Sequence, residues 1–204
     1  MKIGPKYKIC RRIGDRVFGK CQTTKFTISG PDKKRRTGKR PKGAPSEYAL
    51  QLLEKQKARF SYGITERQFS KYVEGVKKHK GSDRATSLFK TLENRLDNVI
   101  FRLGLASSRA LARQLVSHGH ILVNNRRTRV PSLQVKVGDK IKIRPQSLNN
   151  GVFQNLTEKI KDYNTPEWLS LDIEKGEGVV KGEPVVGKAE TIINFESILE
   201  YYSR

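Results

Sequence analysis

The spacing of apolar residues changes near residue 120, and this change constrains the fold more than any other feature of the sequence. Upstream, apolar side chains recur three and four positions apart, as Phe69, Val73 and Val76 do, which is the spacing of one buried helix face. Downstream, charged and apolar residues alternate over residues 140–144, which predicts a strand with one basic, hydrated face. The sequence therefore predicts an α+β protein whose main helices precede a small sheet.

Capping residues and glycines mark where the predicted helices begin and end. Ser46 can cap a helix that Gly63 ends, and Thr65-Glu66-Arg67-Gln68 forms a capping box for the next helix. Asparagine tolerates the left-handed backbone of the tight turn predicted at residues 124–125. The predicted elements are helices at 46–62, from 65, at 83–103 with a bend near Glu93, at 107–118 and at 151–165; a hairpin at 121–130; a strand at 140–144; short strands within 170–190; and a helix or strand at 195–202.

Positive charge is concentrated in the first three quarters of the chain. The net charge is +22; residues 1–150 hold 36 basic and 10 acidic side chains, whereas residues 151–204 hold 6 and 10. A surface this positive repels itself unless it meets a polyanion, so nucleic acid is the first partner to consider. An anionic membrane is the second, but neither a basic helix with a lipid-facing stripe nor an acylation signal is evident, so we expect no membrane binding.

Residues 1–45 form a basic segment with few large apolar side chains and many glycines and prolines. Such a segment cannot bury enough apolar surface to offset the entropy of ordering it, so we expect an extended arm that orders only on RNA. A solvated basic tail is the alternative. The arm residues predicted to contact RNA are Lys33, Lys34, Arg35, Arg36, Arg40 and Lys42.

Cysteine and histidine are scarce in the sequence. Cys10 and Cys21 are too few for a disulfide framework, which indicates a reducing compartment. No apolar run approaches the roughly 20 residues of a membrane span, and the first residues lack the apolar centre of a signal peptide. Three scattered histidines favour neither a metal site nor a catalytic triad, so no cofactor is predicted. We expect a cytoplasmic protein, with an organelle that makes its own proteins as the alternative.

Basic side chains converge where the helix at 107–118 leads into the predicted hairpin. Arg109 and Arg113 lie four residues apart on one helix face, and His118 and His120 flank the end of the helix. The planar guanidinium group of arginine binds phosphate through two parallel hydrogen bonds and stacks on unpaired bases. The region therefore predicts a small α/β RNA-binding module; the alternative is that these arginines are merely solvated.

Ordered motifs along nearly the whole chain resemble those of one family. The central motifs are RLDNVIFRLG at 95–104, ASSRAxARQLVSHGH at 106–120 and Val123-Asn124; the outer ones are SEYALQLLEKQK at 46–57, YGIxERQF at 62–69, PxWL at 166–169 and YYSR at 201–204. The central motifs resemble the S4 RNA-binding domain. The whole set resembles the bacterial-type small-subunit ribosomal protein S4 family, and several motifs in matching order are far more specific than one.

This resemblance implies a structural protein of the small ribosomal subunit with no catalytic activity. It implies primary binding of 16S-type ribosomal RNA, nucleation of 5′-domain assembly and a contribution to translational accuracy. The implied partners are that RNA, neighbouring small-subunit proteins, chiefly S5, and mRNA where it enters the subunit, without homo-oligomers. The implied domains are a basic N-terminal arm (1–45), a helical domain (46–92, completed by 157–204) and a small α/β S4 RNA-binding domain, the alpha-L motif (93–156).

The resemblance also assigns RNA binding to matched polar positions. In the helical domain these are Tyr48, Gln51, Lys55, Gln56, Tyr62, Arg67 and Gln68. In the S4 domain they are Arg109, Arg113, Gln114, Ser117, His118, His120 and Asn124, and Arg126 of the hairpin joins them. Tyr48, Tyr62 and Phe69 also fit a core role, which is the commoner one for aromatic residues at helical spacing.

The N-terminal segment departs from the family pattern. Many relatives hold zinc there with four cysteines, but Tyr7 and Phe26 occupy two of the matching positions. Two thiolates cannot supply the four ligands of a structural zinc site, so we predict no metal, with these two rings packing in its place. The family's Pro-Gly-Gln-His-Gly loop is also missing from residues 30–43, which puts RNA contacts there in doubt. Asn125 stands where relatives usually have glycine.

Two other functions remain as alternatives. Pseudouridine synthases often carry the same RNA-binding domain and use a catalytic Asp in a Gly-Arg-Leu-Asp motif. Here Asn94 replaces the Gly, and Asp97 falls within a helical stripe, so we expect an ordinary Asp on a helix surface. A stand-alone RNA chaperone would not need residues 46–90 or 157–204, which carry family motifs.

Overall fold

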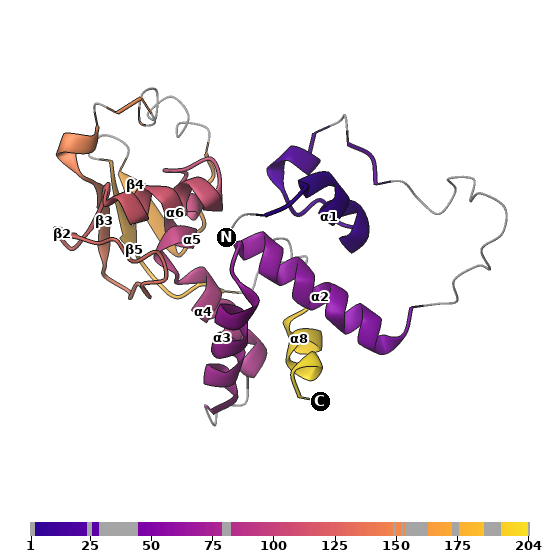
Figure 1. Ribbon diagram of the computed structural model, residues 1–204. Coiled ribbons are helices and arrows are strands. Elements are labelled where there is room, and N and C mark those ends of the chain that lie inside the picture. Colours follow the sequence, from indigo (N-terminus) through magenta and orange to yellow (C-terminus); the bar gives the residue numbers. More distant parts are fainter. Residues whose placement is uncertain are drawn as a thin grey trace. The chain divides into compact units, whose positions relative to one another are not determined.

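The computed structural model describes residues 3–23, 26–28, 45–78, 83–148, 150–151, 153, 163–172, 176–185 and 193–203 (Figure 1). The described part confirms the α+β class, with seven α-helices and one antiparallel sheet. The chain divides into two compact units. The first consists of Met1–Ala85 with Lys188–Arg204, and the second is Thr86–Gly187.

Two helices of the first unit begin and end close to the residues that the sequence indicates. Helix α2 (Glu47–Tyr62) starts after Ser46, whose Oγ accepts a hydrogen bond from the Ala49 backbone N–H at 3.3 Å. It ends at Gly63, whose positive φ of 64° suits a residue without a Cβ. Helix α3 (Glu66–Lys78) then buries Phe69, as its helical spacing predicts.

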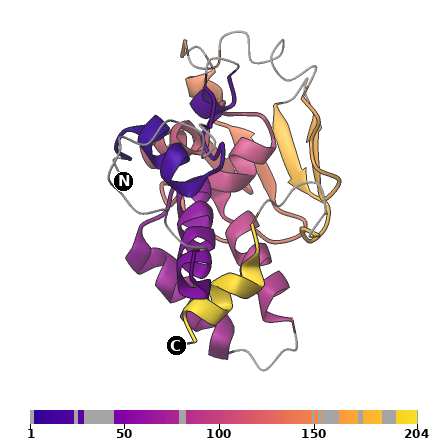
Figure 2. The same ribbon diagram turned by 90° about the vertical axis from the view of Figure 1, so that its right-hand side faces the viewer.

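The C-terminal segment adds a helix to the first unit. Residues 195–202 fit either a helix or a strand in the sequence, and the structure forms helix α8 (Phe195–Tyr201) there. The helix packs along α2 (Figures 1 and 2). The rings of Tyr48 and Tyr201 lie 5.5 Å apart, and those of Phe69 and Tyr202 lie 6.1 Å apart, so aromatic contacts join α8 to both α2 and α3.

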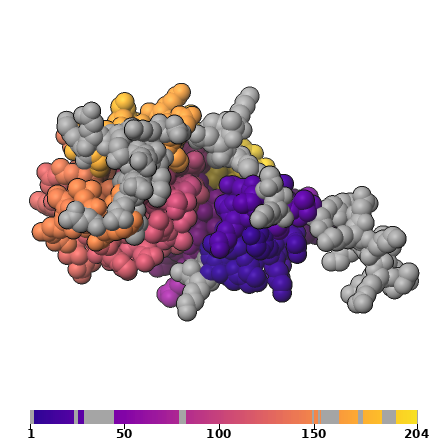
Figure 3. All heavy atoms as spheres, turned by 90° about the horizontal axis from the view of Figure 1, so that it is seen from above, coloured from indigo at the N-terminus to yellow at the C-terminus, as the bar shows by residue number. Residues whose placement is uncertain are grey.

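The first residues differ from the extended arm that the sequence predicts. Residues 6–13 form helix α1 (Lys6–Ile13), and a 3₁₀ turn, η1 (Gly19–Cys21), follows it. In the space-filling view these indigo residues form a compact group (Figure 3). An ion pair of 3.3 Å between Asp15 and Lys57 ties the group to α2. The expectation of an extended arm is therefore wrong for this part, because a small apolar cluster orders it; residues 29–44 lie outside the described residues.

The second unit combines three helices with the sheet. Helix α4 (Arg84–Glu93) leads into α5 (Leu96–Arg102) and α6 (Arg109–His118). The bend predicted near Glu93 falls at Arg95, whose backbone is extended and bridges to Gln134. Helix α6 is capped by Ser108, one residue later than predicted. Apolar residues from α5, α6 and the strands share one core.

The sheet has the strand order β2-β1-β3-β5-β4. Its strands are β1 (Ile121–Val123), β2 (Arg126–Arg127), β3 (Lys140–Ile143), β4 (Leu169–Asp172) and β5 (Glu177–Val180). Asn124 and Asn125 form the hairpin turn between β1 and β2 with φ values of 50° and 63°, as predicted. In β3 the isoleucines are buried and Lys140 is exposed, which confirms the strand predicted from alternating charged and apolar residues.

The last two strands extend the sheet of the second unit. The sequence indicates short strands within 170–190 but assigns residues 157–204 to the helical domain. Instead β5 pairs with β3, and β4 pairs with β5, so residues 169–180 belong to the sheet. The glycine at position 178 lets β5 pack closely against Leu103 at the end of α5. A Cβ added to Gly178 would lie only 2.5 Å from Cδ1 of that leucine. Most of the helix predicted at 151–165 lies outside the described residues.

Candidate nucleic-acid interface

Helix α6 has one buried and one exposed face, and most polar residues predicted to bind RNA lie on the exposed one. Ser108 Oγ accepts a hydrogen bond from the Leu111 N–H at 3.2 Å and fixes the start of the helix. The buried face carries Ala112, Leu115 and Val116. The exposed residues of the helix include Gln114, Ser117 and His118.

Arg113 is held by a buried carboxylate at the base of this surface. Its Nε and Nη2 atoms donate to Oδ2 of Asp97 at 2.9 and 2.6 Å. Arg95 donates to both oxygens of the same carboxylate, at 3.0 and 2.8 Å. Asp97 is only 1% exposed, so the expectation of an Asp on a helix surface is wrong. Two guanidinium groups compensate the buried charge, which a helical spacing pattern cannot reveal.

Arg109 is fixed by a second network that starts from a buried carboxylate. Its Nε donates to Oδ1 of Asn98 at 2.7 Å, and its guanidinium lies 4.5 Å from the centre of the Phe101 ring. Asn98 in turn donates to Glu93 at 2.8 Å, and Arg102 donates to both Glu93 oxygens at 3.0 Å. The two networks position the arginines rather than leaving them to solvent, and four arginines against two carboxylates keep the region positive.

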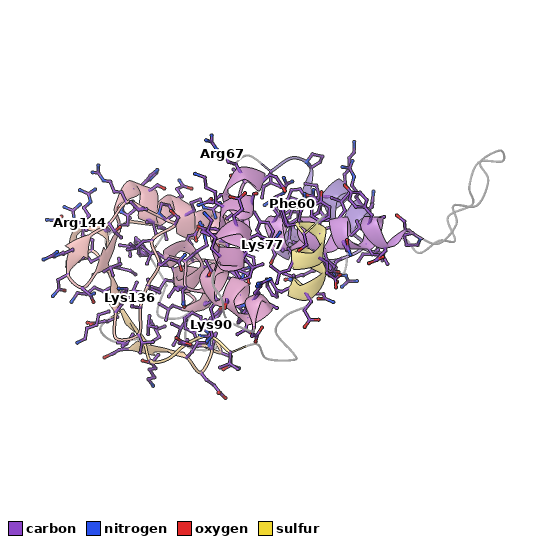
Figure 4. All side chains as sticks on the ribbon, turned by 90° about the horizontal axis from the view of Figure 1, so that it is seen from below. Phe60, Arg67, Lys77, Lys90, Lys136 and Arg144 are labelled. Atoms are coloured by element: carbon purple, nitrogen blue, oxygen red, sulfur yellow. The ribbon has the colours of Figure 1, made fainter. Side chains whose placement is uncertain are left out.

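Basic groups gather at the C-terminal end of α6. Arg127 donates to the backbone oxygens of Gly119 and His118, each at 3.1 Å. The rings of His118 and His120 lie 5.9 Å apart, and Nδ1 of His120 pairs with Ser147 Oγ at 2.9 Å. Desolvation lowers the pKa of His120, and the positive charges of His118, Arg127 and Arg144 lower it further. The basic neighbours, of which Arg144 is labelled in Figure 4, make the local potential positive, and a positive potential attracts phosphate.

At the hairpin, two predicted RNA-binding residues differ in what they do. Asn124 Nδ2 donates to Asp139 at 2.8 Å, and its Oδ1 accepts from the Lys140 N–H at 2.9 Å, so its amide holds the turn against the next strand. Arg126 is exposed on β2. Arg127, one of the arginines that the hairpin was expected to bring to the basic surface, lies at the end of α6, whereas Arg144 is absent from the predicted site although its place at the end of the alternating strand is a signal that could identify it.

In the helical unit, several residues predicted to bind RNA instead make hydrogen bonds to other residues of that unit. Gln51 is 3% exposed and donates to Glu47 and Glu200 at 3.1 Å each. Lys55 is 6% exposed, donates to Glu66 at 2.8 Å and lies 4.6 Å from the Tyr201 ring centre. These polar groups join α8 and α3 to α2, so their direct partners lie within the protein.

The remaining predicted residues of that unit are divided between core and surface. Tyr62 is buried, as the core interpretation expects, whereas Tyr48 is 48% exposed. Gln56 is half-buried, and Gln68 donates to the Tyr72 hydroxyl at 3.2 Å. Arg67 is exposed at the start of α3 (Figure 4). The six predicted arm residues between 33 and 42 lie outside the described residues.

Two aromatic rings pack beside the two cysteines of the N-terminal group. The rings of Tyr7 and Phe26 pack with their centres 5.3 Å apart, as predicted, beside the buried Cys10 and Cys21. Burial, together with a hydrogen bond and charge coupling with Cys10, raises the pKa of Cys21 to about 11. Two thiols with two aromatic rings beside them do not supply the four ligands of a structural zinc site, so the residues present do not fit one. In the described part, no three His, Cys, Asp or Glu side chains gather as metal ligands would.

Membrane insertion has no support in the helices that the structure describes. None of them is both long enough and apolar enough to cross a bilayer.

Comparisons with known proteins agree with these observations. Residues 1–93 match the family "Ribosomal protein S4/S9 N-terminal domain", and residues 94–141 match the family "S4 domain". The chain is 43% identical over 201 residues to small ribosomal subunit protein uS4 of Syntrophomonas wolfei, covering 96% of this chain and 95% of the relative. The protein of the same name from Roseiflexus sp. is 44% identical over 203 residues, with 98% of each chain covered. That of Chloroflexus aurantiacus is 42% identical over 204 residues, covering 99% and 98%.

Proposed function

This chain belongs to the family of small ribosomal subunit protein uS4, and from that premise we propose that it binds 16S-type ribosomal RNA directly and nucleates assembly of the 5′ domain. The proposal includes a contribution to translational accuracy and binding without catalysis. The observation that carries it is the group of basic side chains at the end of α6, where the rings of His118 and His120 lie 5.9 Å apart and Arg127 is bonded to the backbone of residues 118 and 119.

The chemistry of this group suits RNA. Exposed side chains such as Gln114 and Ser117 offer hydrogen bonds beside the cations, and Arg126 adds an exposed positive charge on the hairpin that follows. Cations displace counterions from phosphates, and hydrogen-bonding groups read unpaired bases and 2′-hydroxyls. We place the principal RNA surface in the S4 domain, residues 93–156, with residues 33–42 as a second contact region.

The enzyme alternative receives no support from Asp97. Its carboxylate is enclosed by Arg95 and Arg113 and is 1% exposed, so a nucleotide could reach it only after those ion pairs opened. A catalytic nucleophile must contact its substrate. This Asp is better explained as the anchor of two arginines.

Further partners follow from the same premise. We propose contact with neighbouring small-subunit proteins, chiefly S5, and with mRNA where it enters the subunit, and a place on cytoplasmic ribosomes. Cross-linking of intact small subunits followed by peptide mass spectrometry tests the protein contacts. Cross-links from this chain to S5 are expected, and their absence while other neighbours are captured would contradict that part of the proposal.

Charge reversal on the S4 domain tests RNA binding. We expect the double variant Arg126→Glu/Arg144→Glu to bind small-subunit ribosomal RNA at least about tenfold more weakly and with a shallower salt dependence, because phosphate contacts are lost. Lys181→Glu, an exposed lysine of the same unit in the acidic C-terminal part, is the matched control. Filter binding over a salt series measures both, and equal losses in the variant and the control would contradict the assignment.

A further inference from the structure

A cavity lies between the start of α1 and the end of α2 in the first unit. Its volume is about 350 Å³, at the small end of the range for ligand-binding pockets. Ile3 and Ile9 on one side and Phe60 on the other form its apolar walls. Figure 3 shows α1 in indigo with violet residues of α2 beside it, and the label in Figure 4 places Phe60 on α2.

The rim of this cavity is basic. Lys8, Arg12 and Arg59 line it, and the lining includes no carboxylate. Lys8 and Arg12 lie one helical turn apart on α1, and both are exposed. A cavity with apolar walls and a cationic rim is complementary to a flat, weakly polar ring that carries a phosphate.

Arg59 supplies a second, independent observation. Its guanidinium lies 4.5 Å from the centre of the Phe60 ring, and its Nη1 atom pairs with Glu66 at 3.3 Å. Its Nε atom is buried and has no hydrogen-bond partner among the residues that the structure describes. A buried N–H without a partner is costly, and an acceptor entering the cavity would remove that cost.

We infer that this cavity binds one unstacked nucleobase of the ribosomal RNA. The base stacks on the Phe60 ring or the Arg59 guanidinium, and Lys8 and Arg12 contact the flanking phosphates. The inference rests on the proposed function, because it adds an RNA contact to those proposed for the S4 domain and for residues 33–42. An aromatic ring beside a guanidinium group is the platform that proteins use to hold bases splayed out of single-stranded RNA.

The first test fills the cavity without changing charge. Ile9→Trp places an indole where the base would stack, and Leu50→Trp makes the same kind of addition at an exposed site on α2 away from the cavity. We expect Ile9→Trp to weaken binding to small-subunit ribosomal RNA about tenfold, with an unchanged salt slope, because a base contact is lost and phosphate contacts remain. Leu50→Trp should bind as the wild type does.

A second pair of variants covers the case in which Ile9→Trp fails to fold. Phe60→Leu removes the stacking ring, whereas Phe18→Leu disturbs the Phe18–Phe60 contact of 6.2 Å without changing a residue that lines the cavity. Only Phe60→Leu should weaken RNA binding. RNA containing 4-thiouridine should also cross-link to peptides containing Ile9 or Phe60 in the wild type.

The outcomes separate this inference from the function on which it rests. If the wild type binds the RNA but neither cavity variant binds more weakly than its control, the base pocket is wrong and the proposed function stands. A 4-thiouridine cross-link confined to the S4 domain would also overturn it. If the wild type does not bind the RNA, the proposed function itself fails.

Discussion

At the residue scale, Asp97 determines how the basic surface of the S4 domain is presented. Its carboxylate binds Arg95 and Arg113, of which Arg113 remains 24% exposed. Part of the Arg113 side chain therefore remains open to RNA while the ion pair with Asp97 stays closed. An arginine held in this way has lost side-chain freedom before RNA arrives, which lowers the entropic cost of binding.

Reversing the charge of Arg113 should therefore destabilise the fold as well as weaken RNA binding. Arg113→Glu would place a second carboxylate against the buried Asp97, and we expect a loss of about 3 kcal/mol in the free energy of unfolding. Gln114→Glu adds a negative charge one residue away at an exposed position and should cost less than about 0.5 kcal/mol. Urea unfolding measures both; equal stabilities would show that the Asp97–Arg113 pair is dispensable.

His120 gives the S4 domain a defined pH dependence. Because its folded pKa lies below the usual 6.5, the unfolded chain takes up the proton first as pH falls. The free energy of unfolding should be unaffected by this group well above pH 6.5 and should decrease as pH falls below it. His120→Gln should remove that part of the decrease between pH 7.5 and 5.5, and thermal unfolding at both pH values tests this. A variant whose stability falls as much as that of the wild type would contradict the assignment.

At the element scale, side-chain packing around Phe26 holds the N-terminal helix in place. Phe26 contacts Tyr7 and is buried with Cys10 and Cys21. We expect Phe26→Ala to cost about 3 kcal/mol in the stability of this cluster. Treatment of the wild type with EDTA should leave its melting temperature unchanged. Amide hydrogen exchange within residues 6–21 reports the first effect, and a drop in melting temperature with EDTA would show that a metal contributes after all.

The elements that could be predicted are those with local signals. Ser46 and Gly63 bound α2, and the Asn124-Asn125 turn determines the hairpin, because caps and turns depend on a few neighbouring residues. The partner of β5 could not be predicted, because strand pairing depends on contacts distant in sequence. Helix α1 was missed because its cluster is too small to appear as a periodic stripe.

The candidate site shows the same division. The exposed face of α6 follows from helical spacing, and Gln114, Ser117 and His118, which the family resemblance assigns to RNA binding, lie on that face. Helical spacing could not show that Gln51 donates a hydrogen bond to Glu200 on α8 or that Lys55 pairs with Glu66 on α3. Both partners lie on other helices, so contacts within α2 do not reveal them. Their effect on RNA binding is therefore expected to be indirect, through the packing of the helical unit.

At the scale of the whole molecule, charge asymmetry connects fold and function. The excess of positive charge lies in residues 1–150, whereas residues 151–204 are acidic on balance and supply α8 and two strands that complete the units. The C-terminal part thus contributes to the packing of both units, and we propose that the preceding residues bind the polyanion. This division explains how one chain carries a net charge of +22 and still builds two compact cores.

The most direct test of the central claim sediments the purified chain with protein-free small-subunit ribosomal RNA over a series of salt concentrations. The account predicts an equimolar complex at low salt, formed without any other protein, that dissociates steeply as salt rises. A chain that sediments apart from the RNA at low salt, or a complex that salt leaves unchanged, would contradict it.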